Sequence, residues 1–515
     1  MANNKNKYGQ YFTIKSVAEF MISLISNSKT ARILEPSCGA GVFIRLLQSK
    51  GFENIVGYEI DSELSTDLES VRHESFVSSP IDEMFDSIIG NPPYIRWKNL
   101  ESELKNELKD SILWNHYFNS LCDYLFIFIL KSIEQLNRNG ELIFICPEYW
   151  MNTTHSKSLR NYMVKNGHFS DIYHFKEAPL FEGVNSSFII FRYVKAASNK
   201  KIKLHKYTKK GRPTLDELQD SSCFQEIEIN QFKTNTRWLL ACDEELISIN
   251  EFEAACLKSG DNLFHTDIHR IGDYFDIGNG MVSGLDNAFR IENIESLNRR
   301  ERAFLIDVLK AKDLEPFDNK SNSYYIFVEE SIDEDTFKRE CPTLFKQLDL
   351  HREKLSKRYN YGKDLKIWEF AFPRNKALFD KKAKRIFIPC KERISKKRYF
   401  RFTLANENVF PLQDVTGILQ KSNCRESIEY VLAFLNNERV FNWLIYNGIV
   451  KGDIVEFSEA PLASIPYRPI NWNDDTEVLI HNDIVNNVKA YISSKEDIYI
   501  DQINNNFNML LDGKS

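Results

Sequence analysis

The chain has 515 residues, of which 43% are hydrophobic and 27% are charged. These values exclude a disordered chain, a collagen-like fibre and a small disulfide scaffold, and the length predicts two domains. The net charge is −6, which by itself argues against a nucleic acid as the partner.

The sequence carries no signal for a membrane, for export or for a metal. No apolar stretch is long enough to span a membrane, and the N-terminal residues lack the apolar stretch of a signal peptide. The nine cysteines are scattered without a Cys-x-x-Cys pair, so neither a zinc site nor a disulfide framework is expected. We therefore expect a protein of the prokaryotic cytoplasm that binds no metal.

The first half of the chain predicts strands that alternate with helices. Predicted helices cover residues 42–50 and 123–137, and predicted strands cover residues 32–36, 54–60, 85–90, 141–146, 171–175 and 187–194. This alternation predicts an α/β fold, a doubly wound, Rossmann-like sheet that is largely parallel. The last two strands leave little room for a helix between them, so we expect an antiparallel hairpin at one edge of the sheet.

A glycine-rich turn follows the first predicted strand, in the run Ile33-Leu-Glu-Pro-Ser-Cys-Gly-Ala-Gly41. Gly39 and Gly41 allow a tight turn and a close approach of the backbone to a ligand, although a strand–helix turn alone explains the same pair. Glu59 ends the next strand, where a carboxylate either faces solvent or accepts hydrogen bonds from the two hydroxyls of a ribose. Together the turn and the acid favour a nucleoside cofactor.

The tetrapeptide Asn91-Pro-Pro-Tyr94 directly follows the third predicted strand. A rigid proline turn is the simplest interpretation. A chemical interpretation explains every residue, because the prolines remove backbone donors and leave the Asn91 amide oxygen and the Pro92 carbonyl as acceptors. Tyr94 adds a flat face. Two acceptors beside a stacking face fit an exocyclic amine on a planar ring.

Beyond residue 235 the pattern changes to short strands mixed with helices. We expect strands at 324–328 and 385–389 and helices at 426–436 and 478–493. The predicted organisation is a first domain at 1–235, a linker at 236–265, a mixed α+β domain at 266–470 and a polar, partly helical tail at 471–515.

Two basic runs interrupt an otherwise acidic chain. Residues 195–212 carry eight Lys or Arg and no acid, and residues 374–401 carry twelve Lys or Arg against Asp380 and Glu392. The runs hold charges of +8 and +10, so the rest of the chain holds −24. Clustered cations are typical of a phosphate-binding surface, although either run alone also fits a solvated face.

Four motifs occur in an order that is typical of one enzyme family. They are Gly9-Gln-Tyr-Phe-Thr13, Leu34-Glu-Pro-Ser-Cys-Gly-Ala-Gly41, Gly57-Tyr-Glu-Ile-Asp61 and Asn91-Pro-Pro-Tyr94. The set resembles the gamma-class S-adenosylmethionine-dependent DNA adenine-N6 methyltransferases of restriction-modification type, whose target-recognition domain is C-terminal. The resemblance implies site-specific methylation of the N6 amine of adenine in double-stranded DNA, with S-adenosylmethionine as the cofactor.

The resemblance implies a role for each motif residue. Thr13 and Glu35 would hold the amino-acid part of the cofactor, Gly39 and Gly41 would line its turn, and Glu59 would bind the ribose.

On the substrate side, Asn91 and Pro92 would hold the target amine and Tyr94 would stack on the adenine. Phe181 would close the other face of the extruded base, although a buried aromatic beneath a loop is the ordinary alternative.

One contact departs from the family pattern. The family often has an acid followed by Phe at the position that touches the cofactor's adenine, and the matching stretch here reads Glu74-Ser75-Phe76. Either Glu74 takes this role in a shifted register or the adenine is held more weakly.

The implied partner is double-stranded DNA bound by a monomer, with room for a separate restriction endonuclease that acts on the same site. The target amine lies inside the duplex, so the enzyme must flip the nucleotide out. Twelve cations in the run 374–401 repel one another unless a polyanion is bound. We therefore expect this run to be anchored in the second domain and Lys396, Lys397 and Arg398 to contact DNA phosphates.

Three alternatives stay open. Protein-glutamine and guanine-N2 RNA methyltransferases share the Asn-Pro-Pro-Tyr motif but lack a large C-terminal half with a basic run. A fused nuclease would need a further domain. A non-catalytic DNA-specificity subunit would not need Glu59 and Asn91 in this order.

Overall fold

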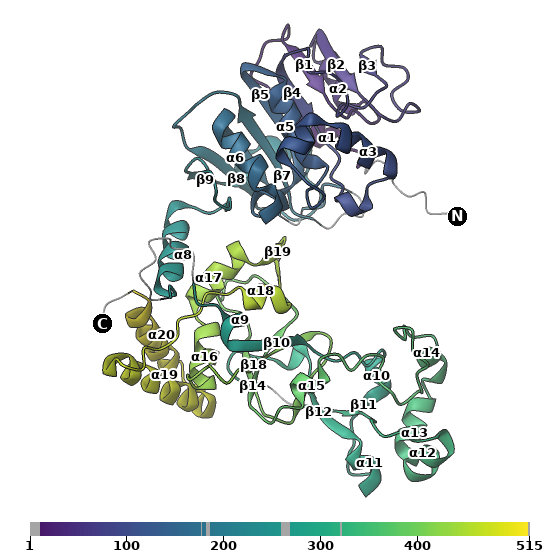
Figure 1. Cartoon of the computed structure of the whole chain (residues 1–515), viewed down its shortest axis with the longest axis vertical. Helices are drawn as coiled ribbons and strands as arrows, with labels where there is room; N and C mark the ends of the chain where they lie inside the picture. Colours follow the sequence, from purple (N-terminus) through teal and green to yellow (C-terminus); the bar gives the residue numbers. More distant parts are fainter. Residues whose placement is uncertain (1–10, 177, 182–185, 259–267, 320–321, 513–515) are drawn as a thin grey trace. The chain divides into compact units, whose positions relative to one another are not determined.

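The computed structural model describes residues 11–176, 178–181, 186–258, 268–319 and 322–512. The chain divides into two compact units (Figure 1). Unit 1 comprises Met1–Asp243 with Lys451–Asp453, and unit 2 comprises Glu244–Val450 with Ile454–Ser515. The segment predicted as a linker, 236–265, contains helix α8 (Asp243–Ala255).

Unit 1 is built on a nine-stranded sheet in the order β3-β2-β1-β4-β5-β7-β6-β8-β9. The strands are β1 (Arg32–Glu35), β2 (Asn54–Tyr58), β3 (Val71–Arg72), β4 (Phe85–Gly90), β5 (Leu136–Pro147), β6 (His168–His174), β7 (Phe188–Val194), β8 (Ile202–Tyr207) and β9 (Phe224–Ile229). Strands β3, β2, β1, β4 and β5 are parallel, and their order reverses direction at β1 and β4. The predicted doubly wound α/β fold is therefore confirmed.

Helices cover both faces of this sheet because the central strands are apolar on both sides (Figure 1). Alternate residues of one strand enter different cores: Leu142 and Phe144 face one side, and Ile143 and Ile145 face the other. The first core takes side chains from α3 (Ser102–Asp110), α4 (Ile112–Tyr117), α5 (Leu125–Glu134) and α6 (Lys157–Asn166). The second takes them from α1 (Lys15–Ser23), α2 (Val42–Ser49) and α7 (Leu215–Gln219).

The predicted hairpin exists, but its place at the edge of the sheet is wrong. Strands β6 and β7 pair antiparallel, and β7 lies between β5 and β6. Two further strands, β8 and β9, extend the sheet beyond β6. Strand β8 lies within the basic run 195–212, whose charge obscured the alternation of its buried residues Ile202 and Leu204 with Lys203 and His205.

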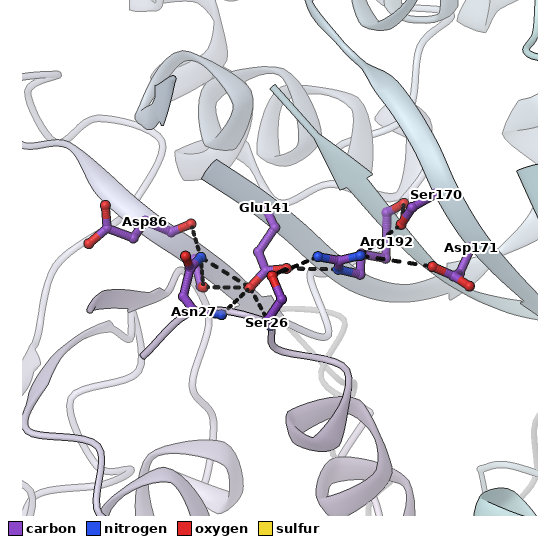
Figure 2. A network of polar contacts seen from close by, with 8 residues as sticks. Ser26, Asn27, Asp86, Glu141, Ser170, Asp171 and Arg192 are labelled. Carbon is purple, nitrogen blue, oxygen red and sulfur yellow. Dashed lines mark hydrogen bonds and ion pairs between the residues drawn. The ribbon is translucent and has the colours of Figure 1, made fainter. Parts of the chain in front are cut away.

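A polar network ties together the amino ends of β4 and β5 (Figure 2). Its centre is Glu141, which is 1% exposed and accepts hydrogen bonds on both carboxylate oxygens. One oxygen accepts from the backbone N–H of Ser26 at 2.9 Å and from the Ser87 hydroxyl at 3.0 Å. The other accepts from Arg192 Nε at 2.7 Å, and Asn27 bridges the first oxygen to β4. Both carboxylate oxygens of Glu141 are therefore partnered by the protein itself.

Unit 2 contains three small sheets. The first has the order β10-β18-β14-β16, from Phe275–Asn279, Val415–Gln420, Arg385–Pro389 and Thr403–Ala405. The second has the order β11-β13-β12-β17, from Arg290–Ile291, Ser323–Ile326, Leu305–Leu309 and Val409–Pro411. The third has the order β15-β20-β19, from Lys391–Arg393, Ile454–Glu456 and Ile449–Lys451.

The segment predicted as a polar tail, 471–515, forms two helices, α19 (Asp475–Ser494) and α20 (Ile498–Leu511). Helix α19 packs on α16 (Ile428–Leu435), and α20 packs on α19. The apolar residues are few, but they fall on one face of each helix, where Ile484, Val488 and Phe507 are fully buried. The predicted helix at 478–493 corresponds to α19, whereas α20 was not predicted from the polar composition of this segment.

Unit 2 also contains all of α8 except its first residue. Its remaining helices are shorter. They are α9 (Ile271–Tyr274), α10 (Asp286–Phe289), α11 (Arg299–Ala303), α12 (Glu334–Glu340), α13 (Pro342–Asp349), α14 (Arg352–Ser356), α15 (Lys376–Phe379), α17 (Glu438–Asn447) and α18 (Glu459–Ala463). Within the described ranges, no helix has the length and apolar character needed to cross a membrane.

Candidate active site

A pocket with a cavity volume of about 140 Å³ lies at the carboxyl ends of β1, β2 and β4 in unit 1. This is where ligands bind in open α/β sheets, beside the point at which the strand order reverses. Seven of the predicted site residues line it: Thr13, Glu35, Gly39, Glu59, Asn91, Pro92 and Tyr94. Segments that are far apart in the sequence therefore converge on one cavity.

The glycine turn forms the floor of the pocket between β1 and α2. Gly39 and Gly41 have φ values of +49° and +76°, in the left-handed region that favours glycine. A Cβ on Gly41 would lie 2.4 Å from Leu68 Cδ1, so only glycine fits there. Gly41 itself does not line the cavity and acts as the N-cap of α2.

Glu35 closes the pocket at the end of β1. Its side chain is 1% exposed, and its Oε2 atom has no hydrogen-bond partner among the described residues. Burial raises the pKa of this carboxyl well above its ordinary value, and the neighbouring Glu59 raises it further. A buried carboxylate oxygen without a donor is costly, and a cationic group of a ligand would satisfy it.

Glu59 ends β2 at the same side of the pocket and is 5% exposed. Its two carboxylate oxygens accept the backbone N–H groups of Gly39 at 2.6 Å and of Asp61 at 2.9 Å. The side chain therefore fixes the glycine turn to the end of β2. Each oxygen keeps a second lone pair, so the predicted contact with a ribose stays a prediction.

The structure shows which residues of the stretch Glu74-Ser75-Phe76 line the pocket. Ser75 and Phe76 line the pocket, whereas Glu74 is exposed and is not part of the lining. The shifted register, in which Glu74 would supply the missing acid, is not seen. A hydroxyl therefore stands where the family often has a carboxylate.

The loop after β4 presents Asn91 to the pocket. The Asn91 Nδ2 atom donates a hydrogen bond to the backbone carbonyl of Tyr11 at 2.7 Å. Because the amino half of the amide is used in this way, the Oδ1 atom faces away from Tyr11, and it is buried without a donor among the described residues. The structure thus leaves one strong acceptor free at the wall of the cavity.

Tyr94 lines the pocket next to Asn91, and its hydroxyl is buried without a partner in the described parts of the chain. Phe181 does not line the pocket. It is 4% exposed, and its ring centroid lies 4.8 Å from that of the fully buried Phe188. Its place in the apolar core is what the ordinary alternative expects, and the stacking role of Phe181 stays a prediction.

The sequence analysis missed several residues of the lining: Tyr11, Phe12, Ser37, Cys38, Tyr124 and Phe128. Tyr11 and Phe12 belong to the Gly9–Thr13 motif, in which only Thr13 received a role. Tyr124 and Phe128 lie one helical turn apart around the start of α5, a spacing that signals a shared face. Helical spacing could therefore have grouped them, but it could not have shown that this face meets a cavity.

The basic run 374–401 is anchored in unit 2 by β14, whose residues are all buried. Arg385, at the start of that strand, is 0% exposed and donates to four backbone carbonyls, those of Phe379, Lys381, Ala383 and Glu407. Five other cations of the run form ion pairs: Lys376–Asp380, Lys381–Asp276, Lys384–Glu429, Arg398–Glu438 and Arg401–Glu392.

These pairs correct one expectation. Six of the twelve cations in the run 374–401 do not need a polyanion, because carboxylates and carbonyls of unit 2 already hold them. The charge count along the sequence could not reveal this, since three of the five carboxylates lie outside the run. Lys396 and Lys397 are exposed.

The chain is similar in sequence to known proteins. Residues 20–181 match the family described as the Eco57I restriction-modification methylase. The chain is 42% identical over 513 residues to the type II methyltransferase M.HindII of Haemophilus influenzae, an alignment that covers 99% of this chain and 98% of that protein. It is 41% identical to the type II methyltransferase M.HincII of Haemophilus influenzae, again over 99% of this chain and 98% of the relative.

Among solved structures, the fold is similar to that of MmeI, a type IIL restriction-modification enzyme in complex with DNA. The TM-score is 0.56 at 12% identity, and the match covers 97% of this chain and 72% of that chain. At this identity the likeness concerns the fold alone.

Proposed function

Since this chain belongs to the type II DNA methyltransferases of restriction-modification systems, we propose that it methylates the N6 amine of a flipped-out adenine in double-stranded DNA. The observation that carries this proposal is the free Asn91 Oδ1 atom beside the ring of Tyr94. An acceptor next to an aromatic face fits an amine on a planar base. The resemblance of Asn91-Pro-Pro-Tyr94 to the adenine-N6 class supports adenine as that base.

The residues present fit S-adenosylmethionine as the cofactor. This compound supplies an activated methyl group when it is bound. Glu35 offers its unpartnered carboxylate oxygen to the cationic amino-acid part, and Thr13, which is 9% exposed, lies in the same lining. The glycine turn lets the backbone approach the ligand, and Glu59 keeps lone pairs for ribose hydroxyls.

On the substrate side, the chain acts mainly by positioning. Asn91 Oδ1 and the Pro92 carbonyl would accept hydrogen bonds from the two N–H groups of the amine. Such bonds would withdraw the nitrogen lone pair from conjugation with the ring and leave it available to attack the methyl group. Holding the reacting atoms in a near-attack arrangement supplies much of the rate enhancement. The amine proton becomes acidic once the nitrogen carries the methyl group, so no strong base is required.

Because the target amine lies inside the duplex, the nucleotide must be flipped out to reach the site. The cost of unstacking is a few kcal/mol, and stacking on Tyr94 offsets part of it. Lys396 and Lys397 of unit 2 are the candidates for phosphate contacts, which position the duplex without reading its sequence. A separate restriction endonuclease that acts on the same site is a further proposed partner.

Sequencing of DNA from cells that express the protein, with detection of modified bases, tests the proposal. The Asn91→Ala variant is the matched control, because it keeps the cofactor pocket intact. We expect N6-methyladenine within one recurring sequence in the wild-type sample and none in the control. N4-methylcytosine in that place would assign a different base, and unmodified DNA would return RNA and protein glutamine as candidate substrates.

A further inference from the structure

The ring of Tyr11 lies flat against the ring of Tyr94. Their centroids are 5.1 Å apart and their planes differ by 1°, which is a parallel, offset stack. The edge of Phe181 meets Tyr11 at a centroid distance of 6.4 Å and an angle of 63°. Tyr11 therefore stacks on Tyr94, to which we assign the target base, and lies beside Phe181, whose stacking role stays a prediction.

Tyr11 covers the side of Tyr94 that is open to solvent. Tyr11 is 38% exposed, whereas the edge neighbour of Tyr94 on another side, Phe188, is 1% exposed and belongs to the core. Tyr94 itself packs against both hydrophobic cores of unit 1. A planar base that stacks on the face of Tyr94 now covered by Tyr11 would therefore have to displace the Tyr11 ring.

We propose that Tyr11 is a residue of the substrate site, whose ring holds the place of the target base in the DNA-free enzyme and leaves when the base arrives. This inference rests on the proposed function, since it takes the stacking face of Tyr94 as the base site. One aromatic ring replaces another on the same face. The stacking surface of Tyr94 is thus covered both before and after the base is flipped.

The backbone at Tyr11 is held in place while the ring moves. The Tyr11 carbonyl accepts the hydrogen bond from Asn91 Nδ2 at 2.7 Å, so a rotation of the side chain alone removes the ring. The same bond keeps the free Oδ1 atom of Asn91 turned towards the cavity. Tyr11 therefore serves the site twice, with its carbonyl as a fixed anchor for Asn91 and with its ring as a movable cover.

Stopped-flow fluorescence tests the exchange of rings directly. The probe is a duplex with the methylation site found by sequencing, in which 2-aminopurine replaces the target adenine and brightens when it leaves the stack. The enzyme is the full chain with S-adenosylhomocysteine. We expect the fluorescence of the Tyr11→Ala variant to rise about 3- to 10-fold faster than that of the wild type, because the ring no longer has to leave.

Tyr11→Phe is the matched control, because it keeps the ring and should keep the wild-type rate. Circular dichroism reports folding, and Tyr11→Leu replaces Tyr11→Ala if that variant does not fold. A rate in Tyr11→Ala equal to or slower than wild type, with the wild-type signal present, overturns the role of Tyr11 alone. A wild-type enzyme that gives no signal overturns the adenine assignment and the Tyr11 proposal together.

Discussion

The large sheet of unit 1 buries a glutamate at each end of its parallel strands. Glu141 lies at the amino end of the sheet and Glu35 at the carboxyl end, and each is 1% exposed. At the amino end, backbone, hydroxyl and guanidinium donors fill both oxygens of Glu141 (Figure 2). At the carboxyl end, Glu35 Oε2 has no donor among the described residues, and neither does Asn91 Oδ1.

Burial alone therefore does not distinguish these two glutamates, but the completeness of their hydrogen bonds does. Buried polar atoms without a partner among the described residues also occur away from the pocket, for example at Gln135 and Trp368, so a missing partner points to a ligand only where the atom also lines a pocket. A buried polar group that lacks a partner destabilises the ligand-free protein, and it persists where a ligand supplies the partner. Glu141 with its donors stabilises the fold. Glu35 Oε2 and Asn91 Oδ1 have no donor among the described residues, and a bound ligand could supply one, as expected of a binding site.

The largest effect should come from breaking the completed network. Replacement Glu141→Gln turns one acceptor oxygen into a donor, which then faces either Arg192 Nε or the Ser26 N–H, depending on the orientation of the amide. We expect the free energy of unfolding of unit 1 to fall by about 3 kcal/mol, as for a buried ion pair that loses one partner. Urea unfolding followed by circular dichroism measures it. Cofactor affinity below the melting transition should stay within twofold of wild type, and a tenfold loss would contradict this division of roles.

The second largest effect should be on the turnover number, with cofactor affinity unchanged. Replacement Asn91→Ala removes the free acceptor and nothing from the cofactor pocket. We expect the turnover number to fall by about 10²- to 10³-fold, the range seen when one preorganised polar group is lost from an active site. Single-turnover methylation of a mapped duplex measures this number, and calorimetry with the cofactor is the control. A variant that keeps more than a tenth of the wild-type turnover would remove Asn91 from the catalytic role.

The carboxyl end of the sheet was also the part most accessible to prediction from sequence. Gly39, Gly41 and Asn91 lie next to their strands in the chain, so local patterns report their positions. The amino end was not predicted, because Glu141 meets Ser26 and Arg192 across 115 and 51 residues. Nothing local distinguishes a glutamate at the start of a strand that is buried from one that is exposed.

Tyr11 was missed for a related reason. Its motif was recognised, but the stack on Tyr94 joins two loops that are far apart in the chain, and only the folded structure brings them together. Strands β8 and β9 were missed because β8 is rich in lysine, which is unusual for a strand that extends a sheet. In unit 2, strands with strong apolar runs such as β14 were predicted, whereas strands of two or three residues leave no periodic signal.

A third replacement places the two glutamates in direct contrast. Glu35→Gln removes a charge from a site without a donor, so the ligand-free protein should unfold no more easily than wild type, unlike Glu141→Gln. Cofactor affinity should fall by about 10- to 100-fold, as when a hydrogen bond to a charged group is lost. Calorimetry and urea unfolding on the same samples measure both quantities. An equal loss of stability in the two variants would show that Glu35 is structural as well.

The raised pKa of Glu35 gives this contrast a pH dependence. The ionised carboxylate binds a cation, so affinity for the cofactor should fall as the pH drops through the raised pKa, by at most about tenfold per pH unit. Stability of the ligand-free protein should change in the opposite direction, because the folded state takes up a proton before the unfolded state does. The Glu35→Gln variant should lose both trends, and a wild-type affinity that does not change as the pH is lowered would contradict them.

The smallest effect should be on the salt dependence of DNA binding. It depends on which cations of the basic run 374–401 of unit 2 already have a partner within the protein. Lys376 and Lys381 have carboxylate partners, whereas Lys396 and Lys397 are exposed and no ion pair with a carboxylate is seen for them in the described ranges. Unpaired lysines are the ones that a phosphate can engage without first losing a partner. Each phosphate neutralised contributes about 0.9 to the slope of log affinity against log salt.

Replacement of Lys396 and Lys397 together by Gln should therefore reduce the salt slope of DNA binding by up to about two and weaken all sequences alike. Replacement of Lys376 and Lys381 by Gln is the control with equal charge change. It should leave the salt slope near the wild-type value, because these two lysines already form ion pairs with Asp380 and Asp276. Fluorescence anisotropy across a salt series measures both. Equal slopes in the two double variants would mean that pairing within the protein does not decide which cations meet DNA.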